Sequence, residues 1–121
     1  MTLTMETTIE ESFKGLRRVY QPENTANVNT VVQFELTGEG GVEFFATLSD
    51  QTMKLQVGHA PSSKVKMNMP AGDFLAMLDG TLSTTDAFTS GKLKVGGNLI
   101  YAMKLATVFK FGVPNKREVS S

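Results

Sequence analysis

The 121-residue sequence contains no cysteine, a single histidine and no excess charge of either sign. Without cysteine, the chain can form no disulfide, thiolate zinc site or cysteine nucleophile. Its 12 basic and 12 acidic residues cancel, which argues against a nucleic-acid-binding surface and removes long-range attraction to an anionic membrane. No apolar run is long enough to span a bilayer. These absences leave an ordinary globular composition with 40% hydrophobic residues.

Both ends of the sequence are free of targeting patterns. Residues 1–6 have neither the basic start nor the apolar stretch of a signal peptide. Residues 118–121 do not match a peroxisomal address of the Ser-Lys-Leu type. We therefore expect a cytoplasmic protein with one domain over residues 1–121, in which residues from about 115 onward form a loose tail.

Four segments alternate apolar and polar residues, which is the pattern of half-buried strands. They lie at residues 30–37, 42–48, 52–57 and 65–69, and a shorter fifth strand is predicted at Lys92–Val95. Short turns join the first three segments, which predicts an antiparallel meander. The alternation also predicts one apolar face and one polar face for the sheet.

Apolar residues at helical spacing predict helices before and after these strands. The first helix runs from about Ile9 to Tyr20 and begins with a capping box at Thr8. A second lies between Pro70 and Gly80, and a short third is capped by Ser83. Together the segments predict an α+β fold, in which about five mostly antiparallel strands are covered on one face by helices.

The last predicted helix, Leu99–Phe109, is apolar almost all round and is capped by Asn98. Only Tyr101, Lys104 and Thr107 carry polar side-chain atoms in it. Its main apolar stripe consists of Leu99, Ala102, Met103, Ala106 and Phe109. Such a helix must be covered on more than one side, by the sheet and by a second layer, a partner chain or an apolar ligand.

The segment Gly91–Asn98, followed by Ala102–Leu105, is similar to the C-terminal signature of sterol carrier protein 2 domains. Asp73–Met77 and Ala87–Phe88 fit the same family in the same order, and the resemblance extends from about Phe34 to Phe109. It implies an apolar cavity enclosed between sheet and helices. It also implies non-catalytic binding, and transfer, of a lipid such as a fatty acid, an acyl-CoA, a sterol or an isoprenoid.

The residues expected to bind the lipid come from three helices that share the apolar sheet face. Simple core packing explains each of them as well, and the resemblance favours the cavity. They are Phe74, Leu75, Leu78, Phe88, Leu99, Met103, Ala106 and Phe109. An alternative function is an accessory or dimerisation module that presents an apolar substrate to a partner enzyme. The expected partner is a lipid and not a nucleic acid, while transient membrane contact and the choice between monomer and homodimer stay open.

No constellation of residues indicates catalysis or metal binding. His59 lies in a loop without partners at a recognisable spacing, so we expect an exposed residue that takes no part in function. No serine sits in a Gly-x-Ser-x-Gly elbow, and Gly38–Gly41 lacks the spacing of a dinucleotide fingerprint. The turn at residues 96–98 offers N–H groups to an anion, although a plain helix cap is favoured. We therefore expect no metal, no cofactor and no enzymatic activity.

Overall fold

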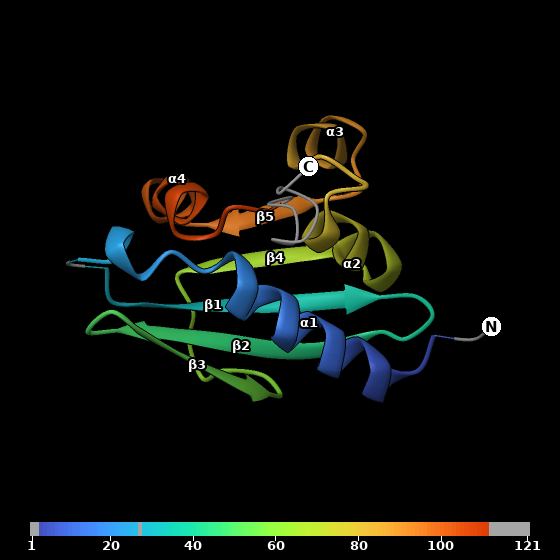
Figure 1. The fold of residues 1–121 in the computed structure, drawn as a ribbon, viewed down its shortest axis with the longest axis horizontal. Coiled ribbons are helices and arrows are strands. Elements are labelled where there is room, and N and C mark those ends of the chain that lie inside the picture. Colours follow the sequence, from blue (N-terminus) through green and yellow to red (C-terminus); the bar gives the residue numbers. More distant parts are fainter. Residues whose placement is uncertain (1–2, 27, 112–121) are drawn as a thin grey trace, which may run out of the picture.

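The computed structural model describes residues 3–26 and 28–111, so the tail predicted at residues 115–121 lies outside the described part. Within these residues, five strands form one mixed sheet in the order β3-β2-β1-β4-β5 (Figure 1). The strands are β1 (Thr30–Thr37), β2 (Val42–Ser49), β3 (Thr52–Val57), β4 (Val65–Pro70) and β5 (Lys94–Gly97). Neighbouring strands are antiparallel except β1 and β4, which are parallel. The predicted α+β class and mostly antiparallel sheet are confirmed.

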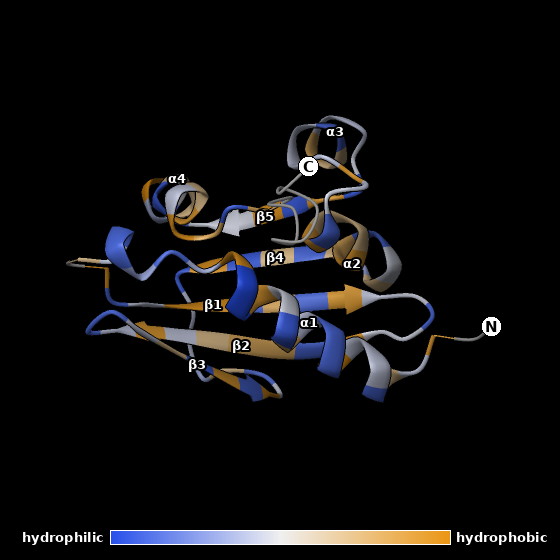
Figure 2. Cartoon of the chain, in the orientation of Figure 1, coloured by the Kyte–Doolittle hydropathy of each residue, from blue (hydrophilic) through white to orange (hydrophobic). Residues whose placement is uncertain are grey.

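The helices pack on the apolar side of this sheet (Figure 1). They are α1 (Met5–Val19), a short 3-10 turn η1 (Pro22–Asn24), α2 (Ala71–Asp79), α3 (Thr84–Thr89) and α4 (Leu99–Val108). In Figure 1, α1 runs across β1 and β2, whereas α3 and α4 lie at the β5 edge. Figure 2 shows hydrophilic residues at intervals along α1, as expected for a helix with one solvated side.

The core lies where α1 and α2 cover the central strands. Phe34 on β1 pairs with Phe44 on β2 and with Met67 on β4, and all three side chains are buried. The rings of Phe34 and Phe44 stack with their centroids 4.7 Å apart. Phe74 of α2 lies against both rings, at 5.5 and 6.2 Å. Alternation along the strands therefore places a continuous aromatic cluster on one face of the sheet.

Helix α1 begins one turn before the predicted start. Thr4 and not Thr8 is its N-cap, because the Thr4 hydroxyl oxygen accepts the Thr7 backbone N–H at 3.1 Å. Thr8 is buried, and its hydroxyl donates to the Thr4 carbonyl at 3.0 Å. Both threonines have the chemistry of a cap, so the sequence pattern alone could not separate them. The predicted end before Pro22 is confirmed, since α1 ends at Val19.

The connection from β3 to β4, residues 58–64, crosses the outer face of the sheet because β2 and β1 lie between these strands. Gln33 anchors the crossing segment and is fully buried. Its side-chain NH₂ donates to the carbonyls of Phe44 and Gly58, both at 3.1 Å, and its side-chain oxygen accepts the Ala60 N–H at 2.8 Å. These bonds satisfy an amide that would otherwise be costly to bury.

Strand β5 spans Lys94–Gly97 and not the predicted Lys92–Val95. The glycine pair that was expected to break the strand forms its last two residues and pairs with β4. A Cβ atom on Gly97 would clash with the Lys64 carbonyl oxygen, and its φ of +100° disfavours any side chain. Glycine is therefore needed here for the close approach of two backbones, which alternation of residue types does not reveal.

We expect Gly97→Ala to lower the free energy of unfolding by about 2 kcal/mol or more, because a strained backbone and a clash act together. Gly96→Ala is a matched control one residue away, since a Cβ there meets nothing within 4 Å. Chemical denaturation of the two variants measures the difference. Equal unfolding midpoints would contradict the role assigned to Gly97.

Candidate functional site

Helix α4 is fixed at its start by the β4–β5 junction. The Asn98 N–H donates to the Lys64 carbonyl at 2.7 Å. The Asn98 side-chain oxygen accepts the N–H groups of Ile100 and Tyr101 at 2.9 and 3.3 Å. The predicted N-cap is thus confirmed. The same bonds occupy helix N–H groups that the sequence could have offered to an anion.

The end of α4 is fixed to the segment that follows α1. The Gln21 N–H donates to the Val108 carbonyl at 2.8 Å, and the Lys110 N–H donates to the Val19 carbonyl at 3.0 Å. The ring of Tyr20 lies against Phe109, with the centroids 6.0 Å apart. Backbone hydrogen bonds therefore hold α4 at both ends, and its middle does not have to pack tightly on the sheet.

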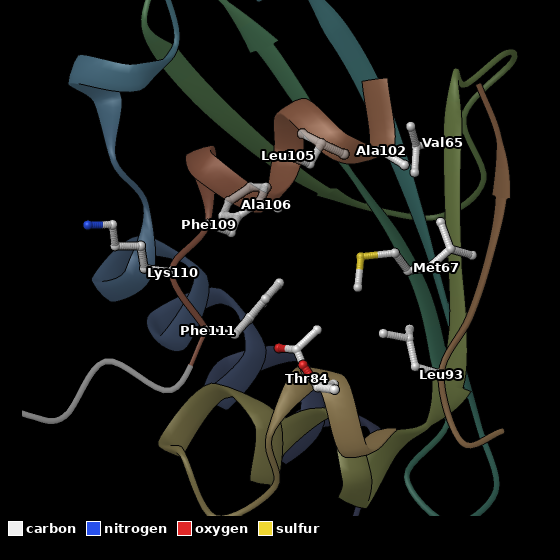
Figure 3. Close-up of a pocket in the computed structure, with 12 residues that line it drawn as sticks. Val65, Met67, Thr84, Leu93, Ala102, Leu105, Ala106, Phe109, Lys110 and Phe111 are labelled. Atoms are coloured by element: carbon white, nitrogen blue, oxygen red, sulfur yellow. The ribbon is translucent and has the colours of Figure 1, made fainter. Parts of the chain in front are cut away.

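Beneath the middle of α4 lies a recess of about 730 Å³ (Figure 3). Strands β4 and β5 form one wall, α4 and the segment after it form the opposite wall, and the start of α3 borders it. Its lining residues are Val65, Met67, Thr84, Thr85, Leu93, Val95, Ala102, Leu105, Ala106, Phe109, Lys110 and Phe111. The recess opens to one side, so the structure has a half-open pocket where the sequence predicted an enclosed cavity.

The surface of the recess is mostly hydrocarbon. In Figure 3, Met67 and Leu93 project from the strand wall toward Phe111 on the opposite side. Lys110 extends away from the strands, so its ammonium group does not enter the space between the walls. Few polar side chains border the recess, among them Thr84 at the start of α3. A recess of this volume and lining suits a ligand with a long or bulky apolar body.

The inward face of α4 is rotated from the predicted stripe. Leu105 is buried, whereas Met103 is 67% exposed and lies outside the recess, so its assignment to an inward stripe is wrong. Ala106 and Phe109 do line the recess. The side chain of Leu99 lies outside the described part of the structure. A helix that is apolar on nearly all sides gives no hydropathy signal for its rotation, which is set by the bonds at its two ends.

The expected site residues on α2 and α3 lie apart from the recess. Phe74 and Leu78 are buried in the core between α2 and the sheet, and Leu75 is partly buried against it. Phe88 is 59% exposed on α3 and does not line the recess. Core packing therefore accounts for Phe74 and Leu78, which is the alternative that the sequence had left open.

The sequence did not single out Val65, Met67 and Leu93, which form the strand wall of the recess. Alternation placed Val65 and Met67 on the apolar sheet face, but it could not say which helix would face them. That depends on the parallel pairing of β1 with β4, which brings β4 between the central strands and β5. No local pattern encodes such a crossover.

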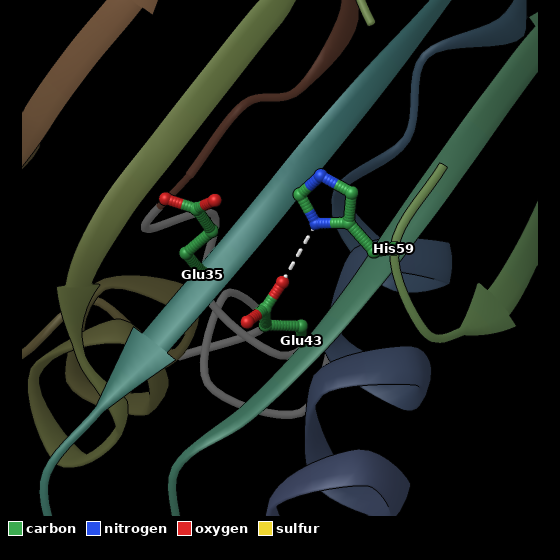
Figure 4. Close-up of side chains that lie close together, drawn as sticks. All are labelled: Glu35, Glu43 and His59. Carbon is green, nitrogen blue, oxygen red and sulfur yellow. Dashed lines mark hydrogen bonds and ion pairs between the residues drawn. The ribbon is translucent and has the colours of Figure 1, made fainter. Parts of the chain in front are cut away.

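A polar cluster lies on the opposite, outer face of the sheet (Figure 4). His59 Nδ1 lies 2.8 Å from Glu43 Oε1, and with Glu35 these side chains offer ligand atoms within 4.8 Å of one another. The expectation that His59 has no partner is therefore wrong. Its partners come from β1 and β2, which no sequence spacing reveals. Glu35 also contacts the Lys66 ammonium at 3.9 Å and the Asn68 amide at 3.3 Å. The grouping is thus a hydrated surface network, remote from the recess.

A mixed sheet covered by helices, with an apolar recess at one edge, defines an α+β binding domain for apolar molecules. The chain belongs to the SCP-2 sterol transfer family, whose model matches residues 13–110. It is 41% identical over 100 residues to Hydroxysteroid dehydrogenase-like protein 2 of Mus musculus, a match that covers 80% of this chain and 20% of that protein. The chain thus spans about a fifth of the length of the curated relatives it matches.

Solved structures agree with the family assignment. Sterol Carrier Protein 2 Like 2 from Aedes aegypti is 25% identical, with a TM-score of 0.69 over 86% of this chain and 98% of that chain. A palmitated SCP2L2 from the same mosquito is 28% identical, with a TM-score of 0.64 over 89% and 94% of the two chains. The predicted resemblance is confirmed, and lipid binding or transfer is the general role that the family assigns. Among residues 3–26 and 28–111, no helix is long and apolar enough to cross a membrane.

We expect His59→Ala to leave lipid affinity unchanged and to lower the free energy of unfolding by less than about 1 kcal/mol, because the His59–Glu43 pair is exposed. Gln33→Leu is the contrasting variant on the same loop, since it strands the Ala60 N–H in a buried site and should destabilise by about 1–3 kcal/mol. Thermal unfolding with and without zinc measures both. Zinc stabilisation of the original protein but not of His59→Ala would show that the cluster is a metal site.

Proposed function

We propose that this domain binds a lipid in the recess beneath α4 and catalyses no reaction on it. The observation that carries the proposal is the apolar recess of about 730 Å³, found in a chain of the SCP-2 sterol transfer family. Fatty acids, acyl-CoA, sterols and isoprenoids share the apolar body that such a lining accepts. The palmitated relative supports a fatty acyl chain among them. Ala106 and Phe109 are the residues of the predicted set that we assign to ligand contact.

The energetics of burial are sufficient for useful affinity. About a dozen buried methylene groups at roughly 0.8 kcal/mol each give on the order of 10 kcal/mol. Ordering of the ligand and of the complex takes back several kcal/mol. The net value corresponds to a dissociation constant in the micromolar range, near −8 kcal/mol. Because the recess is half-open, part of a bound lipid stays in contact with solvent, which eases release and suits transfer.

The curated relatives support a second candidate function. They are about five times the length of the matched segment and are named as dehydrogenase-like proteins. In that setting the domain would hold an apolar substrate for a catalytic partner. The apolar α4 could also pack on another chain, as a dimerisation module. Apparent mass in solution separates these arrangements from a free lipid carrier, since a carrier works as a monomer.

We expect long-chain lipids to displace a fluorescent fatty acid from the purified protein with saturable, micromolar affinity. Native mass spectrometry of protein isolated from its host identifies any lipid that co-purifies. If fatty acids, acyl-CoA and sterols all fail to compete and no saturable binding is found for a monomeric protein, the proposal is wrong.

We expect Ala106→Leu to weaken lipid binding markedly, because the added methyl groups occupy the recess that Ala106 lines. Apo stability should fall by less than about 1 kcal/mol, below the usual effect of overpacking, since Ala106 is exposed in the empty recess. Thr107→Leu is the matched control, as it adds an apolar side chain to the neighbouring exposed position outside the lining. Strong destabilisation with unchanged affinity would instead place Ala106 in solid core.

A further inference from the structure

Charge is distributed unevenly along this neutral chain. Residues 1–86 hold eleven acidic and six basic residues, whereas residues 87–111 hold four lysines and no acidic residue. The second segment supplies β5 and α4, which lie together at one edge of the molecule (Figure 1). That edge is therefore positive and the remainder of the domain is negative. Cancellation in the total conceals a polarity that could orient the domain in an electric field.

The same edge exposes large apolar side chains. On α4, Ile100 is 65% and Met103 is 67% exposed, and on β5 Val95 is 38% exposed. Ile100 and Met103 are three residues apart, so they lie on one side of the helix. This is the side of α4 that neither the sheet nor the recess covers. Val95 also lines the recess, which connects the exposed edge to the candidate lipid site.

Two lysines from different elements meet at one aromatic ring beside these side chains. The ammonium of Lys64 lies 4.9 Å, and that of Lys104 lies 5.3 Å, from the centre of the Tyr101 ring. No acidic residue occurs on β5 or α4 to neutralise them. Exposed aliphatic side chains bordered by tyrosine and lysine are typical of surfaces that lie at the level of bilayer headgroups.

Protection of a strand edge and self-association both fit these features less well than a bilayer does. Lysine on an edge strand discourages strand pairing with other chains, which explains Lys94 but not the exposed Ile100 and Met103. A second copy of the chain would have to place like-charged lysines against each other around a two-fold axis. An anionic bilayer satisfies both the positive charge and the apolar side chains, because a negative headgroup layer covers an apolar interior.

We propose that the surface formed by Lys64, Ile100, Tyr101, Met103 and Lys104 docks transiently on anionic lipid bilayers. The proposal rests on the proposed lipid-binding function for its purpose, since it brings the recess next to a source or an acceptor of lipid. It replaces the inference from net charge that an anionic membrane does not attract this domain. The acidic remainder of the domain faces away from the negative surface, so one orientation is favoured.

The test is co-sedimentation of the full chain with vesicles of phosphatidylcholine alone or mixed with phosphatidylserine. We expect partition into the mixed vesicles to exceed partition into the neutral ones at least about tenfold, and to weaken as salt is raised. Ile100→Gln/Lys104→Gln should lose about tenfold or more of this partition. Val57→Gln/Lys54→Gln makes the same chemical change at exposed positions on β3 and should lose little. Lys64→Gln tests the surface from the side of the sheet, and melting temperatures confirm that each variant is folded.

Fluorescent fatty-acid binding in solution, without vesicles, separates this proposal from the proposed function. Loss of partition by Ile100→Gln/Lys104→Gln with unchanged binding in solution supports docking. Equal partition into neutral and anionic vesicles, or equal loss in both double variants, overturns it. So does a dimer that the variant converts to monomer without any vesicle binding. If the original protein binds vesicles but no fatty acid in solution, the lipid-binding function fails and docking stands.

Discussion

The close approach of β5 to β4 at Gly97 is the contact on which the candidate site depends. Only a residue without a side chain lets the backbone pass the Lys64 carbonyl, and the next residue, Asn98, donates to that carbonyl and caps α4. The helix therefore begins where the edge strand is bonded to the sheet. Its other end is bonded to the chain after α1. A helix held at both ends has its terminal polar groups satisfied without dense packing along its length, and this leaves room for a recess.

The stability of the domain is concentrated away from that recess. The stacked Phe34 and Phe44, with Phe74 above them, fill the space beneath α1 and α2. The two helices meet closely, because a Cβ on Gly15 would lie 2.8 Å from the Leu78 side chain. Arg18 adds a hydrogen bond of 2.8 Å to the Leu78 carbonyl, close to the end of α2. Dense packing at one end of the sheet allows looser packing at the other, where the apolar recess lies.

The sequence predicts those parts of this structure that depend on neighbours along the chain. Strand alternation, the Asn98 cap and the helix end at Gly80, whose φ is +90°, all follow from local chemistry and are confirmed. The prediction fails where two solutions are locally equivalent, as for Thr4 and Thr8 at the start of α1. It also fails where the cause is a distant backbone, as for the glycines of β5. The partners of His59 could not be found in this way either.

Helix α4 shows why its rotation could not be predicted and what that ambiguity means physically. An amphipathic helix has one apolar side and therefore one stable orientation on a sheet. In α4 the apolar residues are divided among three environments: Leu105 lies in the core, Ala106 borders the recess, and Ile100 faces solvent. Only the first environment is needed for folding. The excess apolar surface on the other two sides is a cost to a domain that only has to fold, so its reason must lie in function. A ligand in the recess and a bilayer beneath the edge would each remove one side from water, and both would do so without changing the packing that holds the helix in place.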